Sequence, residues 1–195
     1  MTVSQKWTGL RFPDSRLVGL IARYVPRKQG SAVDVGCGSG NNTKMLTDFG
    51  FDAYGVECNP QMLEIARSNG ISVIDSAIEK FIPEQVPYLL VAWGITPLAD
   101  IKDVAGQLAK VGAEYIVCDW RTEKNTIFKY PDNVWLGEQE LIFKNSRSHL
   151  YDLHYRFHSQ EECRIPGYEL VKIQTLTVTE GDELNEWYQT VFKKL

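Results

Sequence analysis

The stretch that decides the fold is Val33-Asp-Val-Gly-Cys-Gly-Ser-Gly40, in which a turn of three glycines joins a short apolar strand to a helix. Glycines at such a turn allow backbone amides to approach a ligand closely. A dinucleotide-binding fold would have the spacing Gly-x-Gly-x-x-Gly, but Asn41 stands where its third glycine would lie. No Gly-Lys-Ser or Gly-Lys-Thr follows, so the stretch is not a phosphate-binding nucleotide loop.

Two acidic residues accompany this turn. Asp34 lies two residues before Gly36, where a carboxylate repels a pyrophosphate and suits a cationic ligand. Glu57 ends the next predicted strand, where an acid can accept hydrogen bonds from both hydroxyls of a ribose. The turn and the two acids together predict a site for a nucleoside.

Strands and helices alternate through residues 14–119, because the apolar period switches repeatedly between two and about 3.6 residues. This alternation predicts a parallel sheet with right-handed crossovers. We expect Asp14 to cap the first helix and Pro60 to open the third. The predicted strands are 31–35, 51–56, 71–74, 88–93 and 115–119. The predicted helices are 17–24, 42–49, 60–68 and 97–111.

The last third of the chain has a different pattern, with strand-like segments joined by short turns and few helical residues. These segments are 141–143, 150–157, 169–178 and 187–192. Short links suit antiparallel strands, so we expect an antiparallel addition at one edge of the parallel sheet. The chain is then one domain, 1–195, in which 1–30 form an N-terminal lid and helix, 31–120 a cofactor-binding half and 121–195 an acceptor-side part.

Composition and charge exclude several classes of protein. The net charge is −4, and because the first 30 residues carry +5, an acidic body of −9 follows them. An acidic body argues against binding to duplex nucleic acid. No apolar run approaches the ~20 residues of a membrane span, and no secretory signal is visible. The four cysteines are far apart, so we expect reduced thiols, a cytoplasmic location and no metal.

With these motifs, the chain resembles the class I S-adenosylmethionine-dependent methyltransferases, most closely the small single-domain bacterial type. The acid and glycines of their first motif match Asp34, Gly36, Gly38 and Gly40, and the acid of their second motif matches Glu57. The resemblance implies an α/β, doubly wound, mostly parallel seven-stranded sheet with an antiparallel C-terminal edge. It also implies S-adenosyl-L-methionine as the cofactor and methyl transfer as the reaction.

The resemblance further implies roles for individual residues. The turn, including Cys37, and Asp34 would hold the methionyl end of the cofactor, and Glu57 its ribose. Cys58 and Ile78 would sandwich the adenine, with Ser76 and Ala77 at its edge. Trp93 would line the same site. The N-terminal segment from Trp7 to Asp14 would fold over the cofactor as a lid, with Arg11 paired to its carboxylate.

Acceptor contacts are expected at the carboxyl ends of the fourth and fifth strands. The signature (Asn or Asp)-Pro-Pro-Tyr is absent there, which argues against methylation of adenine or glutamine amides. Trp120 and Arg121 are predicted to contact the acceptor, and Trp93 and Trp120 either form aromatic walls or simply pack.

All three histidines of the chain, His149, His154 and His158, fall within ten residues. On a strand, His154, Arg156 and His158 share one face with Asp152, opposite an apolar face. A neutral histidine there would take a proton from the acceptor, and Arg156 would bind it, whereas a plain solvated edge strand is the alternative. The sequence thus favours methyl transfer to oxygen or nitrogen of a small molecule or saccharide. A protein or RNA methyltransferase and a non-catalytic cofactor-binding partner subunit remain the alternatives, and the oligomeric state is open.

Overall fold

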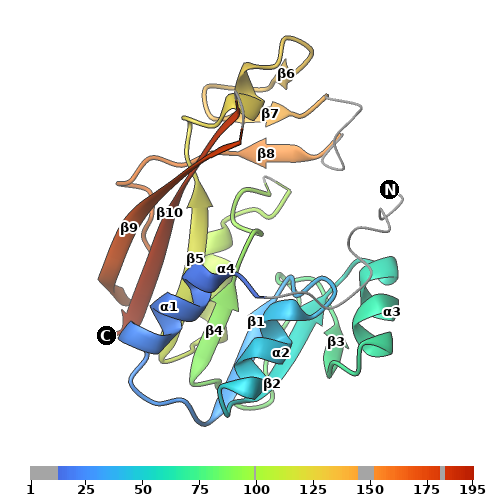
Figure 1. The fold of residues 1–195 in the computed structure, drawn as a ribbon, viewed down its shortest axis with the longest axis vertical. Helices are drawn as coiled ribbons and strands as arrows, with labels where there is room; N and C mark the ends of the chain where they lie inside the picture. The colour runs from blue at the N-terminus through green and yellow to red at the C-terminus, as the bar shows by residue number, and fades with distance from the viewer. Residues whose placement is uncertain (1–12, 99, 145–151, 181–182) are drawn as a thin grey trace.

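A seven-stranded sheet forms the centre of the molecule, in the order β3-β2-β1-β4-β5-β10-β9 (Figure 1). The structure, a computed structural model, describes residues 13–98, 100–144, 152–180 and 183–195. The strands of this sheet are β1 (Ser31–Val35), β2 (Asp52–Glu57), β3 (Val73–Asp75), β4 (Leu89–Ala92), β5 (Tyr115–Arg121), β9 (Tyr168–Glu180) and β10 (Glu183–Lys194). The first five are parallel, and β10 is antiparallel to both β5 and β9. This arrangement confirms the predicted fold class.

The first and third helices begin where the sequence predicts, at Asp14 and Pro60. The helices are α1 (Ser15–Tyr24), α2 (Asn41–Asp48), α3 (Pro60–Ser68) and α4 (Val104–Val111), with a 3-10 helix, η2 (Thr126–Lys129), after β5. The Asp14 carboxylate accepts a hydrogen bond from the Arg16 amide at 2.9 Å, which satisfies an otherwise free donor of α1. Asn59 caps α3 in the same way, and Pro60 occupies its first turn.

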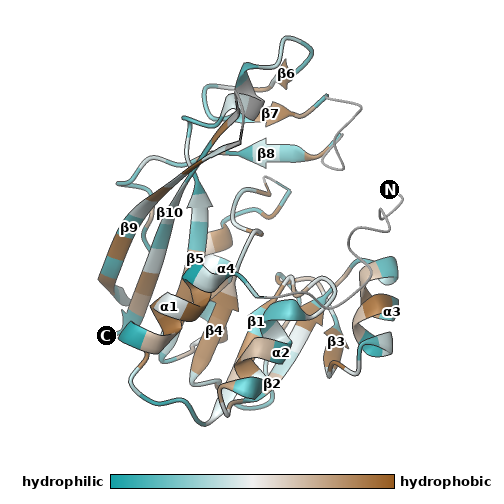
Figure 2. Ribbon diagram, in the orientation of Figure 1, coloured by the Kyte–Doolittle hydropathy of each residue, from teal (hydrophilic) through white to brown (hydrophobic). Residues whose placement is uncertain are grey.

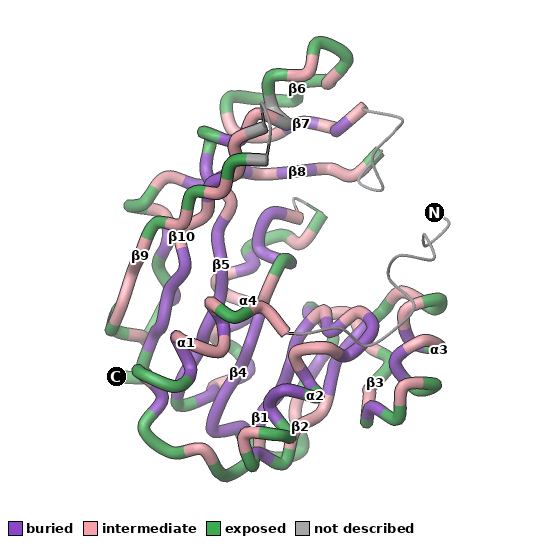
Figure 3. Tube along the Cα trace, in the orientation of Figure 1, coloured by how far each residue is buried: buried purple, intermediate pink, exposed green. Residues whose placement is uncertain are grey.

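Two apolar cores lie on the two faces of the sheet. Side chains of a strand alternate between faces, so Leu89 and Val91 of β4 pack under α1 and α2, whereas Leu90 and Ala92 pack under α4. In Figure 1, α1 and α2 lie in front of the sheet. Strand β4 is apolar along its length in Figure 2 and buried along its length in Figure 3, as a strand covered on both faces must be.

One predicted helix is shorter than expected. The sequence predicts a helix over 97–111, but α4 begins only at Val104. Its cap is Asp103, which has a φ of +50° and whose carboxylate accepts a hydrogen bond from the Gly106 amide. This side chain satisfies the first amides of the helix, so the helix starts there.

A second, three-stranded sheet corrects the prediction for the C-terminal third. Residues 141–143 and 150–157 were expected at the edge of the main sheet, but β6 (Val134–Trp135), β7 (Glu140–Ile142) and β8 (His154–Arg156) form a sheet of their own, in the order β6-β7-β8. Their apolar side chains pack against one another as a separate core. Figure 1 shows this sheet above the carboxyl end of β5.

Backbone contacts tie the second sheet to the carboxyl ends of β4 and β5. The Arg156 amide donates to the Pro97 carbonyl at 2.8 Å, and the His158 amide donates to the Arg121 carbonyl at 2.8 Å. Arg11, His149 and most of the proposed lid lie outside the described residues. In the part of the chain that is described, no helix is long and apolar enough to cross a membrane.

Candidate active site

The glycine turn after β1 forms a cradle. Gly36, Gly38 and Gly40 all have positive φ, at +69°, +56° and +90°, which favours glycine at each position. A Cβ on Gly36 would lie 2.1 Å from Ile95, and one on Gly40 would lie 2.4 Å from Ile71. A Cβ on Gly38 would instead meet nothing closer than the end of the Met62 side chain at 3.7 Å. The turn is therefore packed from behind at its two ends and open above Gly38.

Glu57 lies at the rim of this cradle, as the sequence predicts for the residue that ends β2. Its carboxylate accepts hydrogen bonds from the amides of Gly38 at 2.9 Å, Cys58 at 2.9 Å and Asn59 at 2.8 Å. Three charge-assisted bonds fix the orientation of the carboxylate and join it to the turn. The acid and the turn thus form one rigid unit.

Asp34 lies deeper than the sequence suggests. It is only 1% exposed, and its carboxylate accepts a hydrogen bond from the Thr43 hydroxyl of α2 at 2.7 Å. Burial raises the pKa of Asp34 to about 7. In this conformation Asp34 supports the turn from beneath, and its predicted contact with a cationic ligand stays a prediction.

The residues predicted to surround an adenine gather next to Glu57. The Ser76 amide donates to the Glu57 carbonyl at 3.1 Å, and the Ser76 hydroxyl donates to the Ala77 carbonyl at 3.0 Å. Cys58 is exposed, whereas Ile78 is buried in the core on the α4 face. The structure thus brings these four residues to one edge of the sheet, with Cys58 the most accessible of them.

Cys37 faces inward from the turn. A Cβ on Gly55 of β2 would lie 2.4 Å from the Cys37 sulfur, so Gly55 provides the space for this thiol. Burial raises the pKa of the Cys37 thiol far above its ordinary value. Cys37 is therefore a packing residue of the turn, and its backbone is the part available to a ligand.

The structure fits a nucleoside cofactor at this edge. The open space above Gly38 gives room for a ligand against the backbone, and the fixed carboxylate of Glu57 presents acceptors at its rim. When bound there, S-adenosylmethionine supplies an electrophilic methyl group on a sulfonium.

A polar cluster lies beside the turn at the carboxyl ends of β4 and β5, where the sequence predicts acceptor contacts, and it contains Asp119, for which the sequence predicts no individual role. The Asp119 carboxylate accepts a hydrogen bond from the Gly94 amide at 2.7 Å, and the Trp93 indole donates to the Asp14 carboxylate at 3.3 Å. Burial raises the pKa of Asp119 to about 6. Because Ile95 packs against Gly36, this cluster borders the cofactor turn directly.

Arg121 lies on the same face of β5 as Asp119, two residues further along the strand. Its guanidinium carbon is 5.2 Å from the centre of the Trp187 ring and 5.6 Å from that of Tyr155. Its buried Nε has no hydrogen-bond partner, and no described residue forms an ion pair with it. Burial lowers the pKa of Arg121 from its ordinary value, without neutralising so strong a base.

The two described histidines, His154 and His158, lie on the opposite face of the sheet. A cavity of about 510 Å³ next to α4 is lined by Trp120, His154, Arg156 and His158, together with the loop after β4. Trp120 and Arg121 point to opposite faces because they are adjacent on β5, so the predicted acceptor residues are divided between two places. No described cofactor-motif residue lines this cavity.

The two described histidines have different surroundings. His154 lies between two carboxylates, with Nδ1 3.2 Å from Asp100 and Nε2 3.4 Å from Glu140. His158 was expected on the exposed face of a strand, but β8 ends at Arg156 and His158 is buried against the Trp120 ring. Burial lowers the pKa of His158, and its Nε2 donates to the Thr96 carbonyl at 3.2 Å, so Nδ1 is its available base.

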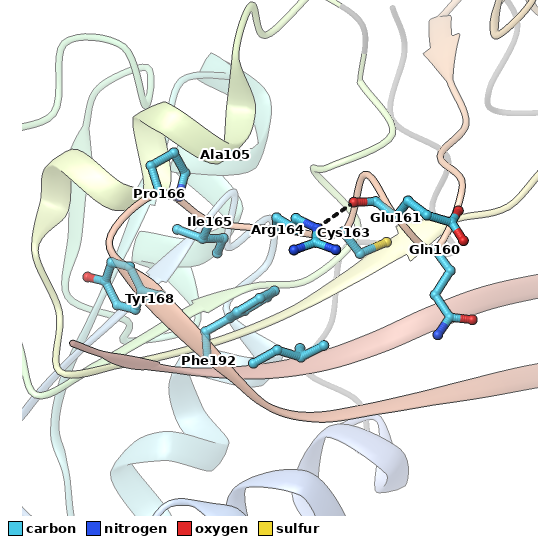
Figure 4. A pocket seen from close by; sticks show the side chains of 10 residues that line it. Ala105, Gln160, Glu161, Cys163, Arg164, Ile165, Pro166, Tyr168 and Phe192 are labelled. Atoms are coloured by element: carbon cyan, nitrogen blue, oxygen red, sulfur yellow. Dashed lines mark hydrogen bonds between the residues drawn. The ribbon is translucent and has the colours of Figure 1, made fainter.

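A second cavity, of about 560 Å³, lies between α4 and the start of β9 (Figure 4). Figure 4 shows Ile165, Tyr168 and Phe192 around it, and Arg164 donating to the Glu161 carbonyl. None of the described residues predicted to bind cofactor or acceptor lines it.

Comparison with known proteins agrees with this geometry. Residues 33–111, from β1 to the end of α4, match the family model described as "Methyltransferase domain". No curated protein sequence matches the chain significantly. This match supports S-adenosylmethionine-dependent methyl transfer as the reaction and S-adenosylmethionine as the cofactor.

Several solved structures share the fold at low sequence identity. The PH0226 protein of Pyrococcus horikoshii is 15% identical with a TM-score of 0.70, over 99% of this chain and 97% of that one. An S-adenosylmethionine-dependent methyltransferase of Methanosarcina mazei is 12% identical with a TM-score of 0.71, over 90% and 97%. The 1,6-didemethyltoxoflavin-N1-methyltransferase of Burkholderia thailandensis is 13% identical with a TM-score of 0.66, over 97% and 81%.

Proposed function

We propose that the chain transfers the methyl group of S-adenosylmethionine to an oxygen or nitrogen atom of a small-molecule acceptor bound at the carboxyl ends of β4 and β5. The observation that carries this proposal is the second sheet, which lies over these strand ends and is bonded to them through Arg156 and His158. A covered edge favours a small acceptor over a folded protein or an RNA. The name of one structural neighbour, from Burkholderia thailandensis, states that it methylates a small molecule.

In this proposal, Asp119 takes the proton that the acceptor loses. Its carboxylate lies on the face of β5 that adjoins Gly94 and the cofactor turn, and with a pKa of about 6 it is mostly ionised at pH 7. With S-adenosylmethionine bound at the turn, its sulfonium would supply the methyl group and leave as the neutral thioether, and Asp119 would accept the proton that the acceptor atom releases. A base so placed contributes about 10²–10⁴ in rate.

The histidines are the second candidates for this role. His158 has an available Nδ1 next to Thr96 of the loop after β4, whereas His154 lies between two carboxylates. The position of His158 on the α4 face favours Asp119 over it, and His154, His158 and Arg156 stay predicted acceptor residues.

The test is methyl transfer from labelled S-adenosylmethionine by the full chain in a metabolite extract, with protein and RNA fractions assayed in parallel. Label in the small-molecule fraction supports the proposal. Label only in protein or RNA would replace it, and cofactor binding without transfer to any fraction would leave a non-catalytic partner subunit.

A further inference from the structure

Arg121 has a feature that neither the cofactor site nor the fold explains. A buried guanidinium is normally paired, because an unsatisfied buried donor costs about 1–3 kcal/mol. Two other described arginines near this end of the sheet are paired: Arg16 with Asp14 on the same face, and Arg156 with Glu140 and Glu162 on the opposite face. Unlike these two, Arg121 has no ion pair to a described residue. Its Nε is buried without an acceptor, as is the Nε of Arg156, so the missing ion pair is what sets Arg121 apart.

The aromatic rings around Arg121 keep it in place without using its donors. Trp187 and Tyr155 lie 5.2 and 5.6 Å from the guanidinium carbon, within the range of a cation–π contact. Trp187 is directly opposite Arg121 in the β5–β10 pairing, and Tyr155 belongs to the second sheet. The side chain is therefore held between the main sheet and its cover, and its N–H fork is available for a planar anion.

The charges nearby favour a single negative charge on that anion. Among the described residues on this face, Arg16 is the cation near Arg121, and Asp14 and Asp119 are the acids near them. With the two acids ionised, the charges of the four groups sum to zero. Arg121 can therefore balance one negative charge of a ligand, whereas the second charge of a dianion would be repelled by the two carboxylates.

We propose that Arg121 recognises a carboxylate group on the methyl acceptor. This inference rests on the proposed function, in that the acceptor lies at the carboxyl ends of β4 and β5. Arg121 and Asp119 lie two residues apart on one strand face, roughly 7 Å along the strand. An acceptor of a few bonds' length can thus place its carboxylate at Arg121 and its hydroxyl or amine at Asp119.

The experiment measures binding of benzoate to the full chain saturated with S-adenosylhomocysteine, by calorimetry, with benzamide as the neutral isostere. We expect benzoate to bind at least tenfold more tightly than benzamide. Arg121→Met should weaken benzoate binding at least tenfold, and Arg121→Lys, which keeps the charge without the fork, should weaken it less. Affinity for S-adenosylhomocysteine should be unchanged in both variants, which also shows that they are folded.

The matched control is Arg27→Met, because Arg27 also stacks on an aromatic ring, Tyr88 at 4.2 Å, but lies at the amino end of the sheet. It should leave benzoate binding unchanged. Equal binding of benzoate and benzamide, tighter binding of phenyl phosphate than of benzoate, or unchanged binding in Arg121→Met would overturn the inference.

The same variants separate this inference from the proposed function. If benzoate binding depends on Arg121 but no small molecule is methylated, the proposed function is wrong and the anion site at Arg121 stands. If carboxylate acceptors and their amides are methylated equally well, the proposed function stands and the anion site is wrong.

Discussion

Glu57 is held by three backbone amides, of which that of Gly38 belongs to the glycine turn. Glu57→Ala removes the acceptors for a ribose and leaves the three donors without their carboxylate. We expect it to weaken binding of S-adenosylhomocysteine by about 1–3 kcal/mol, measured by calorimetry. Glu64→Ala, on the exposed side of α3, is the control. Equal affinity in Glu57→Ala and the wild type would mean that the ribose is held elsewhere.

Asp119 gives the reaction a pH dependence. Its pKa of about 6 means that the carboxylate loses its charge as the pH falls through 6, so turnover should decline on that acidic side. Asp119→Asn should lower kcat about 10²-fold and remove this acidic limb. His158→Gln should still show the decline of turnover at acidic pH if Asp119 is the base. If that decline disappears in His158→Gln and persists in Asp119→Asn, the histidine is the residue that accepts the proton.

Asp34 links the same kind of titration to stability. Its folded-state pKa of about 7 lies above the ordinary 3.8, so the group contributes stability below about pH 4 that is lost as the pH rises through 7. Asp34→Asn cannot ionise, so its free energy of unfolding should fall less than that of the wild type between pH 5 and pH 8, by about 1–4 kcal/mol. Denaturant titrations at the two pH values measure this difference. Parallel pH profiles of the two proteins would show that the buried group is already neutralised or paired in another way.

At the scale of single residues, the sequence was sufficient to place the glycine turn beside Glu57, because their spacing reflects a local strand–turn–helix geometry. Asp119 and the environment of Arg121 were beyond it. Their roles depend on Gly94, Trp187 and Tyr155, which are distant in the chain and meet only after the strands pair.

At the scale of elements, the turn makes a testable distinction between glycines needed by the fold and one needed by the ligand. Gly38→Ala fits the free protein apart from its φ of +56°, whereas Gly40→Ala also collides with Ile71. We expect Gly38→Ala to cost about 1–2 kcal/mol of stability and to weaken cofactor binding strongly. Gly40→Ala should destabilise the fold by more.

Gly70→Ala is the matched control for that pair, since Gly70 has a φ of +75° with nothing within 4 Å of a Cβ. It should lose about as much stability as Gly38→Ala and bind S-adenosylhomocysteine normally. Thermal melts and calorimetry on the three variants make the comparison. Normal cofactor binding in Gly38→Ala would place the ligand away from the turn.

The sequence predicted the start of a helix correctly where a neighbouring residue caps it. It predicted boundaries and pairings wrongly where contacts between distant residues decide them. Asp14, Asn59 and Pro60 start helices as polar and proline caps should. The helix expected from 97 starts at Val104 because the Asp103 side chain competes for its first amides. The strands at 140–142 and 154–156 form their own sheet because a separate apolar cluster pairs them with each other.

At the scale of the whole molecule, binding of the cofactor product should be visible as stabilisation. S-adenosylhomocysteine binds the folded state alone, so it should raise the melting temperature of the chain in a concentration-dependent way. NADH should produce no shift, because the turn lacks the third glycine of a dinucleotide site and has Asp34 beneath it. Thermal shift with both compounds checks this, and a shift with NADH alone would contradict the cofactor assignment.

The sequence was sufficient to predict a parallel main sheet with an antiparallel edge. Alternating strands and helices admit few topologies, and short turns late in the chain imply antiparallel strands. The second sheet was not predictable, because nothing local distinguishes a strand that extends a sheet from one that covers it.

The four cysteines differ in a way that has a practical use. Partial burial and the nearby Glu57 raise the pKa of the Cys58 thiol, and burial raises that of the other three, so exposure is what separates them. Cys37, Cys118 and Cys163 are buried, whereas Cys58 is exposed at the edge predicted to hold the adenine. A thiol-specific dye at mildly alkaline pH should therefore attach to the native protein at a single position. Because a bound nucleoside would shield that position, the rate of dye attachment reports how much of the protein is occupied, even before any acceptor is known.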